Sequence, residues 1–445
     1  MHAADNNSQG LRGVKLVLRA LRGRNYKLFF AGQGISLVGT WMQQVAMGWL
    51  VYRLTNSVFF LGVVGFASQI PTFFIAPFAG VLADRYSRRY ILIATQILSM
   101  IQALALAILV LTSTVSLWHI VALSVFIGLI NAFDIPARQA FVYELVDSPE
   151  DLPNAIALNS MIFNGARLAG PSVAGILIAA AGEGVCFLAN AVSFLAVLVA
   201  LAVIRLPRPK TAQPQVRVLS DLKAGVVYAF GFVPIRLILI LLAFISLVGM
   251  PYAVLMPVFA RDILHGGPQT LGFLMGSVGV GALAGALFLA SRKNIQGLGK
   301  IMVFSIALLG VGVIAFSFSQ IFWLSMLLIL FAGFGMMVHM ASINTILQTI
   351  VDDDKRGRVM SLYTMAFMGM APFGSFLAGS VAHILGAPNT LRISGLFCIF
   401  AAVAFWAKLP VIREKIHPIY VRKGIIPQVA TGIGSATQLT IQTKE

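Results

Sequence analysis

The fold is decided by a charged stretch between two long apolar runs, Gly80-Val81-Leu82-Ala83-Asp84-Arg85-Tyr86-Ser87-Arg88-Arg89. Residues 54–83 and 90–133 contain no Lys, Arg, Asp or Glu. Four charges within six residues, enclosed by such runs, predict a very short loop at a membrane surface. Because three of the four are arginine, the positive-inside rule predicts that this surface is cytoplasmic.

The composition is that of an integral membrane protein. The chain has 445 residues, of which 59% are hydrophobic and only 11% charged, whereas soluble proteins carry about 25% charged residues. The net charge of +17 lies in loops and tails, so it predicts topology and contact with membrane lipids and no nucleic-acid partner. We find no nucleotide-binding loop and no metal-ligand spacing, so we expect neither an enzyme nor a cofactor.

The apolar runs divide into twelve spans at about 20 helical residues per bilayer crossing. We place them at 28–52, 58–82, 90–111, 116–137, 153–180, 184–204, 236–260, 269–291, 300–319, 321–348, 359–384 and 388–407. With both termini in the cytoplasm, all but four of the 32 Lys and Arg residues lie on that side; Arg53, Arg261 and Arg392 face out and Arg167 lies within a span. The predicted fold is all-α, with twelve transmembrane helices.

The spans group into two bundles. We expect a basic cytoplasmic arm at 1–27, a six-helix bundle at 28–205, a Pro-rich cytoplasmic linker at 206–235, a second six-helix bundle at 236–408 and a cytoplasmic tail at 409–445 that is disordered. The bundles share short identities. Residues 35–39 recur at 245–249 and 61–62 at 271–272, both at an offset of 210, 146–147 recurs at 351–352, and 174–175 recurs at 378–379. This order predicts two six-helix pseudo-repeats with the substrate path between them.

The pattern Gly-x-x-x-Asp-Arg-x-x-Arg-Arg at 80–89 resembles the signature loop between the second and third helices of the major facilitator superfamily. The resemblance implies that Gly80 allows close helix packing. It also implies a cytoplasmic gate that latches the two halves together, formed by Asp84, Arg85, Arg88, Arg89 and Arg138. Ser87 stands where the family often has glycine. At the repeat offset Asp84 falls on Asn294, so the gate is expected to be asymmetric.

Three further stretches narrow the resemblance to one branch. Residues 22–33, 38–43 and 136–140 are similar to the branch that includes the enterobactin exporter and related drug-efflux proteins, and the similarity covers residues 20 to 408. It implies a bacterial inner-membrane exporter, driven by the proton gradient without a cofactor, for siderophores or amphipathic drugs. We expect a monomer in contact with membrane lipids.

Two charged residues in the first bundle are candidates for the transport path. A charge at the centre of a span costs about 2.5–3.5 kcal/mol on insertion scales, so Arg167 must face the interior. It either lines the cavity or pairs with Asp134 and staples two helices. Asp134 is the carboxylate best placed to carry a proton, and its alternative role is to pair with Arg85 or Arg138 in the gate.

The remaining candidates are uncharged. Gly165, Gly170, Pro171 and Gly175 form a small-residue face that resembles the fifth-span signature of facilitator exporters, and a plain helix-packing motif is the alternative reading. Several polar residues within spans could line a cavity, although each could equally serve an interhelical hydrogen bond. They are Gln33, Gln43, Gln44, Asn131, Asn164, His339 and Asn344, with Gln69 and Tyr363 as weaker members.

The sequence therefore predicts a secondary active transporter that exports a siderophore or drug-like molecule by alternating access. The alternatives are a transporter of lysophospholipids or other lipids, an importer, and a receptor that reuses the fold without transport.

Overall fold

The computed structural model describes residues 19–205, 218–292 and 294–425, except for the side chains of 76, 77, 80–85 and 218–222. This part of the chain contains helices and no strands. Much of the expected arm, the Pro-rich part of the linker and the final 20 residues of the tail lie outside the described residues.

The first half holds six long helices. They are α2 (Arg24–Thr55), α3 (Val58–Arg85), α4 (Arg88–Leu111), α5 (Leu117–Leu145), α6 (Leu152–Ala181) and α7 (Glu183–Val203). Two short helical turns, η1 (Arg19–Arg22) and η2 (Pro149–Asp151), precede α2 and α6. The bounds follow the predicted spans to within about four residues, because long uncharged runs leave few places for a helix to end, except that α5 continues to Leu145, beyond the end predicted at 137.

The second half is built from shorter pieces. It comprises α8 (Val218–Gly231), α9 (Val233–Val248), α10 (Tyr252–Val258), the π-helical η3 (Phe259–Ile263), α11 (Pro268–Ala290), α12 (Leu298–Phe318), α13 (Phe322–Ile350), α14 (Arg356–Met368), α15 (Ala371–Leu385) and α16 (Ala387–Arg422). Eleven segments of the described chain are long and apolar enough to cross a membrane. The twelfth span is α2, a helix of 32 residues whose hydropathy is lowered by three glutamines.

Two predicted spans are wrong as single helices. The span predicted at 236–260 breaks between α9 and α10, and that at 359–384 breaks between α14 and α15. Pro251 supplies the physical reason for the first break, because its ring removes a backbone donor and clashes with the preceding turn. The two breaks lie close together: a Cβ on Gly374 would meet the Leu247 carbonyl oxygen at 2.4 Å and the Pro251 ring at 2.9 Å.

The last helix is longer than predicted. The span predicted at 388–407 continues as helix to Arg422, with Pro410 and Pro418 inside it. The first part of the expected disordered tail is therefore ordered, because Ile412 and Ile416 are buried against the bundle.

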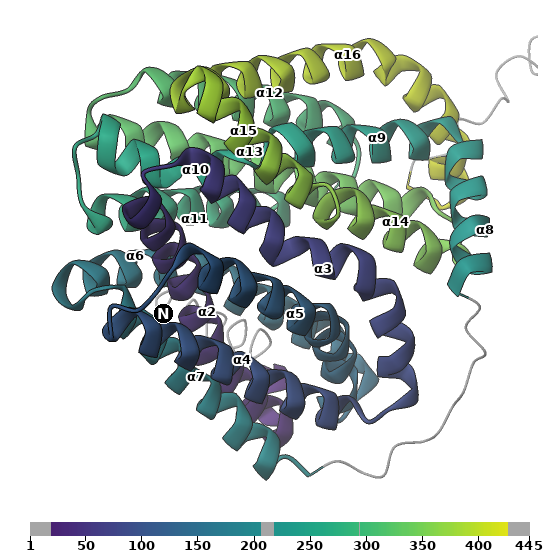
Figure 1. Ribbon diagram of the computed structural model, residues 1–445. Helices are drawn as coiled ribbons and strands as arrows, with labels where there is room; N and C mark the ends of the chain where they lie inside the picture. The colour runs from purple at the N-terminus through teal and green to yellow at the C-terminus, as the bar shows by residue number, and fades with distance from the viewer. Residues whose placement is uncertain (1–18, 206–217, 293, 426–445) are drawn as a thin grey trace, which may run out of the picture.

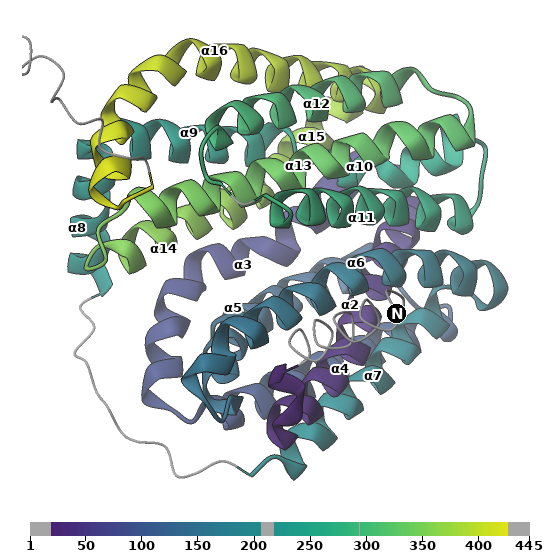
Figure 2. The same ribbon diagram turned by 180° about the vertical axis from the view of Figure 1, so that it is seen from behind.

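The twelve spans form two bundles that lie side by side (Figures 1 and 2). Within the first bundle α2 packs on α6 and α7, and α3 packs on α5. The bundles meet where α6 packs on α11 and α3 packs on α15, with α10 against α2 and α3. We refer to the end of the molecule with the 86–87 turn and α8 as the loop end, and to the opposite end, with Tyr52 and Asp262, as the clasp end.

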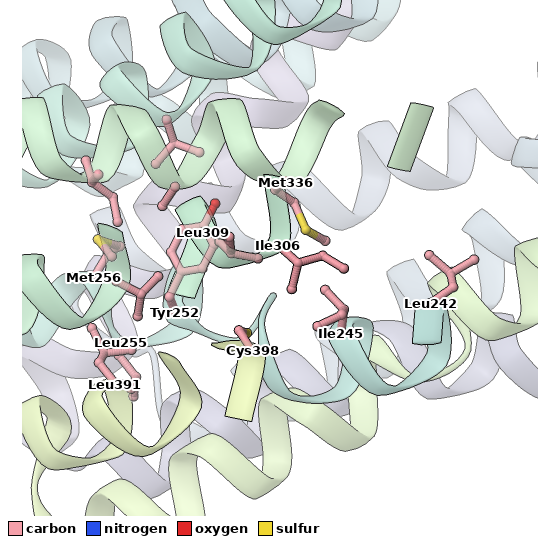
Figure 3. Packing of buried hydrophobic residues seen from close by; sticks show 14 of the residues in the cluster. Leu242, Ile245, Tyr252, Leu255, Met256, Ile306, Leu309, Met336, Leu391 and Cys398 are labelled. Carbon is pink, nitrogen blue, oxygen red and sulfur yellow. The ribbon is translucent and has the colours of Figure 1, made fainter. Parts of the chain in front are cut away.

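Most of the buried apolar side chains form one large cluster shared by both halves and a separate one in the first half. One cluster runs through the second half and crosses into the first at the clasp end, where it includes Leu50, Leu61 and Phe187. Figure 3 shows its central part, where side chains of α9, α10, α12, α13 and α16 converge. A separate cluster occupies the loop end of the first half, around Phe29, Phe141 and Leu158. The apolar core is thus continuous between the halves at the clasp end.

Candidate functional site

Two glycine pairs hold the halves in contact. A Cβ on Gly175 of α6 would lie 3.0 Å from the Gly272 Cα of α11, and a Cβ on Gly62 of α3 would lie 2.9 Å from the Gly379 Cα of α15. No other residue permits such a backbone approach. These four are the glycines that recur at offsets 210 and 204, so the two contacts are related by the internal repeat.

A polar cluster joins the halves at the same end. The Tyr52 hydroxyl donates to the Asp262 carboxylate, and Arg261 Nη1 donates to Asn56 Oδ1 at 2.7 Å. The Arg261 guanidinium also lies 5.7 Å from the centre of the Tyr52 ring. We call Tyr52, Asn56, Arg261 and Asp262 the clasp. None of the four was predicted as a gate residue. Tyr52 and Asp262 nevertheless occupy equivalent positions of the two repeats, because they are separated by the repeat offset of 210.

The predicted cytoplasmic gate makes different contacts. Arg88 pairs with Glu144, Arg89 Nη2 donates to the Ala202 carbonyl oxygen at 3.1 Å, and Arg138 pairs with Asp134 at 3.4 Å. All three contacts stay within the first half. The side chains of Gly80, Asp84 and Arg85 lie outside the described residues.

The second half has its own pairs at the loop end. Asp352 accepts a hydrogen bond from the Tyr228 hydroxyl of α8 at 3.0 Å and pairs with Arg422 of α16 at 3.3 Å. At this end α3 of the first half runs between α5 and α14 in both views (Figures 1 and 2), and it contacts α8 of the second half. The described ion pairs of the loop end therefore fasten elements within each half, whereas the clasp fastens one half to the other.

Arg167 lies on α6 at the seam between the halves. Its guanidinium lies 5.8 Å from the centre of the Trp41 ring, and Trp41 packs edge-to-face on Phe163 at 5.8 Å. The backbone at Arg167 and Leu168 packs on Gly279 of α11, in the other half. Arg167 is half-buried and has no carboxylate partner among the described residues.

Asp134 has other partners than Arg167. It is buried, with 4% of its surface exposed. Oδ1 accepts hydrogen bonds from Thr95 Oγ1 at 2.9 Å and Gln96 Nε2 at 2.8 Å, and Oδ2 pairs with Arg138 one turn along α5. In the described chain Asp134 thus joins α4 to α5, and the predicted staple to Arg167 is not formed.

The three glutamines of α2 differ in their exposure to solvent. Gln43 is buried, donates to Gln102 Oε1 at 2.9 Å and accepts from Asn190 Nδ2 at 2.7 Å. It therefore forms the interhelical network that was the alternative to a cavity role. Gln44, the next residue, is exposed. Gln33 is buried, and its Oε1 has no hydrogen-bond partner among the described residues.

Among the other polar candidates, Asn344 of α13 and Tyr363 of α14 lie beside each other, and the rest make separate contacts. Asn164 donates to the Ser160 carbonyl oxygen one turn earlier, Gln69 donates to the Gly65 carbonyl oxygen, and Asn344 accepts from Gln348 at 2.6 Å. His339 is fully buried, and neither ring nitrogen has a partner in the described chain. Asn131 and Tyr363 are half-buried.

The small-residue motif on α6 packs against two helices. A Cβ on Gly170 would lie 2.5 Å from the Trp41 Cβ of α2, and a Cβ on Gly272 would lie 2.5 Å from the Pro171 carbonyl oxygen. A Cβ on Gly165 meets nothing within 4 Å. Gly170, Pro171 and Gly175 thus form helix contacts, including the seam, while Gly165 is not needed for packing.

Two six-helix halves that are related by an internal repeat and meet along a seam define a major facilitator transporter. The model of the transmembrane secretion effector family matches residues 17–422, and the chain belongs to this family.

Characterised relatives span nearly the same length. The chain is 26% identical to the Staphyloferrin A transporter of Staphylococcus aureus (85% of this chain, 95% of that protein). It is 28% identical to the multidrug efflux pump Tap of Mycolicibacterium fortuitum (86% and 93%). It is 23% identical to the macrolide efflux protein A of Streptococcus pyogenes (88% and 97%).

Solved structures share the fold at low identity. A bacterial homologue of the human lysosomal transporter Spinster, in an inward-facing and occupied conformation, aligns with a TM-score of 0.68 and 12% identity over 88% of this chain and 98% of that chain. A bacterial homologue of the iron transporter ferroportin aligns with a TM-score of 0.66 and 17% identity over 86% and 98%.

Proposed function

We propose that this protein is a proton-coupled exporter of a siderophore or an amphipathic drug-like molecule that works by alternating access. The contrast between the two ends carries the proposal. The glycine pairs and the clasp join the halves at one end, while the described ion pairs at the other end stay within each half. Two rigid bundles that meet along a seam of close helix contacts can rock about that seam.

The charge distribution orients the molecule. Arginines gather at the loop end, so the positive-inside rule assigns this end and both termini to the cytoplasm of a bacterial inner membrane. In this orientation the structure is closed toward the outside. Opening toward the outside requires the clasp residues of the two halves to separate. Closure toward the cytoplasm brings residues 84–89 against the second half. Arg88, Arg89 and Arg138 then become the cytoplasmic gate together with Gly80, Asp84 and Arg85.

The seam suggests the substrate class. Arg167 offers a cation without a carboxylate partner among the described residues, beside the aromatic rings of Trp41 and Phe163. An exposed Gln44 lies one turn beyond Trp41 on the same helix. A cation flanked by aromatic faces suits an anionic molecule with apolar or aromatic parts. The relatives that transport staphyloferrin A, macrolides and multiple drugs support this choice.

Asp134 is our candidate for the proton carrier. It is a buried carboxylate at the loop end whose neighbours Thr95, Gln96 and Arg138 are all donors. Protonation would weaken the pair with Arg138 and free that arginine for the gate. The boundaries of the two bundles, a monomeric state and a proton gradient as the energy source are parts of the same proposal.

The test is transport in proteoliposomes with an imposed pH gradient, screening siderophores, dyes and lysolipids. We expect gradient-driven substrate movement that is lost in Asp134→Asn and Arg167→Gln, while Gln320→Ala, on an exposed residue between α12 and α13, keeps it. Movement of lysolipids alone would favour the lipid transporter. Binding without movement would favour the receptor, and uncoupled transport by wild type would refute proton coupling.

A further inference from the structure

A cavity of about 260 Å³ lies in the second half, away from the seam and the clasp. Its walls come from the first turns of α9 and α12, the last turns of α13 and the extended end of α16. All four segments lie at the loop end. Sites for drug-sized ligands measure about 300–1,000 Å³, so this cavity is too small for the expected transport substrate but has room for a single hydrocarbon segment.

The cavity has an apolar floor and a polar mouth. Met302, Phe405 and Leu409 form part of the floor and are buried. Arg413 and His417 stand at the mouth, one helical turn apart, with exposed side chains. Leu298 and Gly299 also line it at the N-terminus of α12, where the helix dipole favours a negative charge. This combination suits an amphipathic molecule with an anionic head.

The outer surface of α16 shows where the membrane ends. Phe400 and Val403 are 68% and 64% exposed, as expected for side chains that face lipid tails. Trp406 follows and packs on Phe304 at 5.7 Å. Exposed aromatic pairs of this kind mark the membrane–water interface of a bilayer.

Charged side chains make up half of the exposed residues beyond Trp406 in the described chain: Lys408, Arg413, Glu414, Lys415, Arg422 and Lys423. Arg413 lies seven residues after Trp406, which corresponds to about 10 Å of helix. Figure 1 shows the end of α16 bending toward α8. Phe405 of the floor is adjacent to Trp406, so the floor lies at the membrane–water interface and the mouth lies on the headgroup side of it.

We infer that this cavity binds an anionic phospholipid of the leaflet at the loop end. One acyl chain occupies the apolar floor, and the phosphate lies between Arg413, His417 and the first turn of α12. The lipid fills the gap between α12 and α16, and it fastens the bent end of α16 to the second half. This assignment does not depend on the proposed substrate or on proton coupling.

Photolabelling of the full-length protein tests the assignment. The protein is placed in nanodiscs of phosphatidylcholine containing phosphatidylglycerol with a diazirine on its acyl chain, and labelled peptides are mapped by mass spectrometry. We expect labels concentrated on residues 295–302 and 405–420, competed by unlabelled phosphatidylglycerol but not by added phosphatidylcholine. Labels spread evenly over the lipid-facing helices would overturn the site.

Matched variants separate a specific site from general charge attraction. Loss of one basic residue near an anionic surface lowers affinity by at most about fivefold through general attraction, and Lys415→Ala, which does not touch the cavity, should lower labelling by no more than this. Arg413→Ala also removes a charge-assisted hydrogen bond to the phosphate, so it should lower the labelling of this site by about tenfold or more. Gly299→Leu should also lower labelling, because a Cβ there already lies 2.9 Å from Leu409 Cδ1 and the larger side chain narrows the cavity.

Two other occupants give distinct results. Competition by glycerol phosphate as strong as that by phosphatidylglycerol would mean a free phosphate site and would refute the lipid. Gln296 Nε2 donates to the Ile425 carbonyl oxygen at the mouth, so the rest of the chain begins nearby. Cross-links from residues 426–445 to the cavity, in place of lipid labels, would assign the cavity to the tail.

Discussion

The two ends of this transporter hold together in different ways. At the clasp end the backbones of the halves touch through Gly62 with Gly379 and Gly175 with Gly272, and a small polar cluster spans the junction. At the loop end the described pairs, such as Arg88 with Glu144 and Arg422 with Asp352, remain within one half. Close packing joins the halves at one end, and charge rigidifies each half at the other.

The difference fits the rocking movement proposed above. In such a movement the contacts within a half would survive, so they can be numerous. The contacts between the halves would break in every cycle, so they would have to be few and weak enough to reverse. The clasp meets this condition because Asp262 is exposed to solvent, and exposed ionic contacts contribute about 0–1 kcal/mol.

The largest effect is expected from filling a glycine contact. In Gly272→Val the new side chain would meet the backbone of Pro171 and Gly175, which cannot move aside locally. Overpacking of this kind costs about 1–3 kcal/mol, and here it acts on the closed clasp end. Distance measurements by electron resonance should show the clasp end opened and transport largely lost. Gly165→Ala is the matched control, and an equal effect there would contradict the role of the contact.

Disrupting the buried polar network of the first half should lower thermal stability. It should not change the equilibrium between conformations with the clasp end closed and open. Gln43→Leu leaves Gln102 Oε1 without its donor and Asn190 Nδ2 without its acceptor. Buried polar groups that lose a partner cost about 1–3 kcal/mol, so thermal unfolding of the purified protein should shift to lower temperature. Gln44→Leu, on the exposed neighbour, should shift it little. A change in the distances between the halves in Gln43→Leu would show that the network is not confined to one half.

Breaking a clasp contact should shift the equilibrium between the closed and open clasp end by less than Gly272→Val does. Asp262→Ala removes the acceptor of the Tyr52 hydroxyl, and at an exposed site this is worth about 1 kcal/mol, or roughly fivefold in the ratio of the two states. Cysteine accessibility at the clasp end should rise accordingly. Glu183→Gln breaks the pair with Arg53 within the first half and serves as the control. A similar rise in the control would argue against a special role for the clasp.

The smallest effect concerns the docking of α8 on the second half. Partial burial and the Asp352 carboxylate raise the pKa of Tyr228 above its ordinary value of 10.0. A raised pKa means that the folded state holds the proton more tightly, so this contact is intact below pH 10 and weakens as the pH rises above that value. The tyrosinate absorbance of wild type minus that of Tyr228→Phe should titrate above pH 10. A difference titration at or below pH 10 would show that the contact is absent in solution.

Much of the architecture was predictable. Hydropathy and the distribution of arginine predicted twelve spans, because a bilayer demands long uncharged helices and few charges outside. The repeat includes the four seam glycines, but their contacts across the two halves were not predicted. The helix breaks at Gly249–Pro251 and at Gly369 were not predicted, because glycine and proline within spans are common and are tolerated wherever neighbours accept the freed backbone groups.

The partners of individual polar side chains could not be predicted. The sequence by itself determined the membrane fold, the two repeats and the charge asymmetry, because these depend on composition and order along the chain. Only the tertiary structure decided that Asp134 pairs with Arg138 and leaves Arg167 beside Trp41, that Gln43 is structural while Gln44 is exposed, and that a clasp closes the end opposite the arginine loop. Helix rotation and the approach of distant helices set these contacts, and a small change in either redirects a side chain to another neighbour.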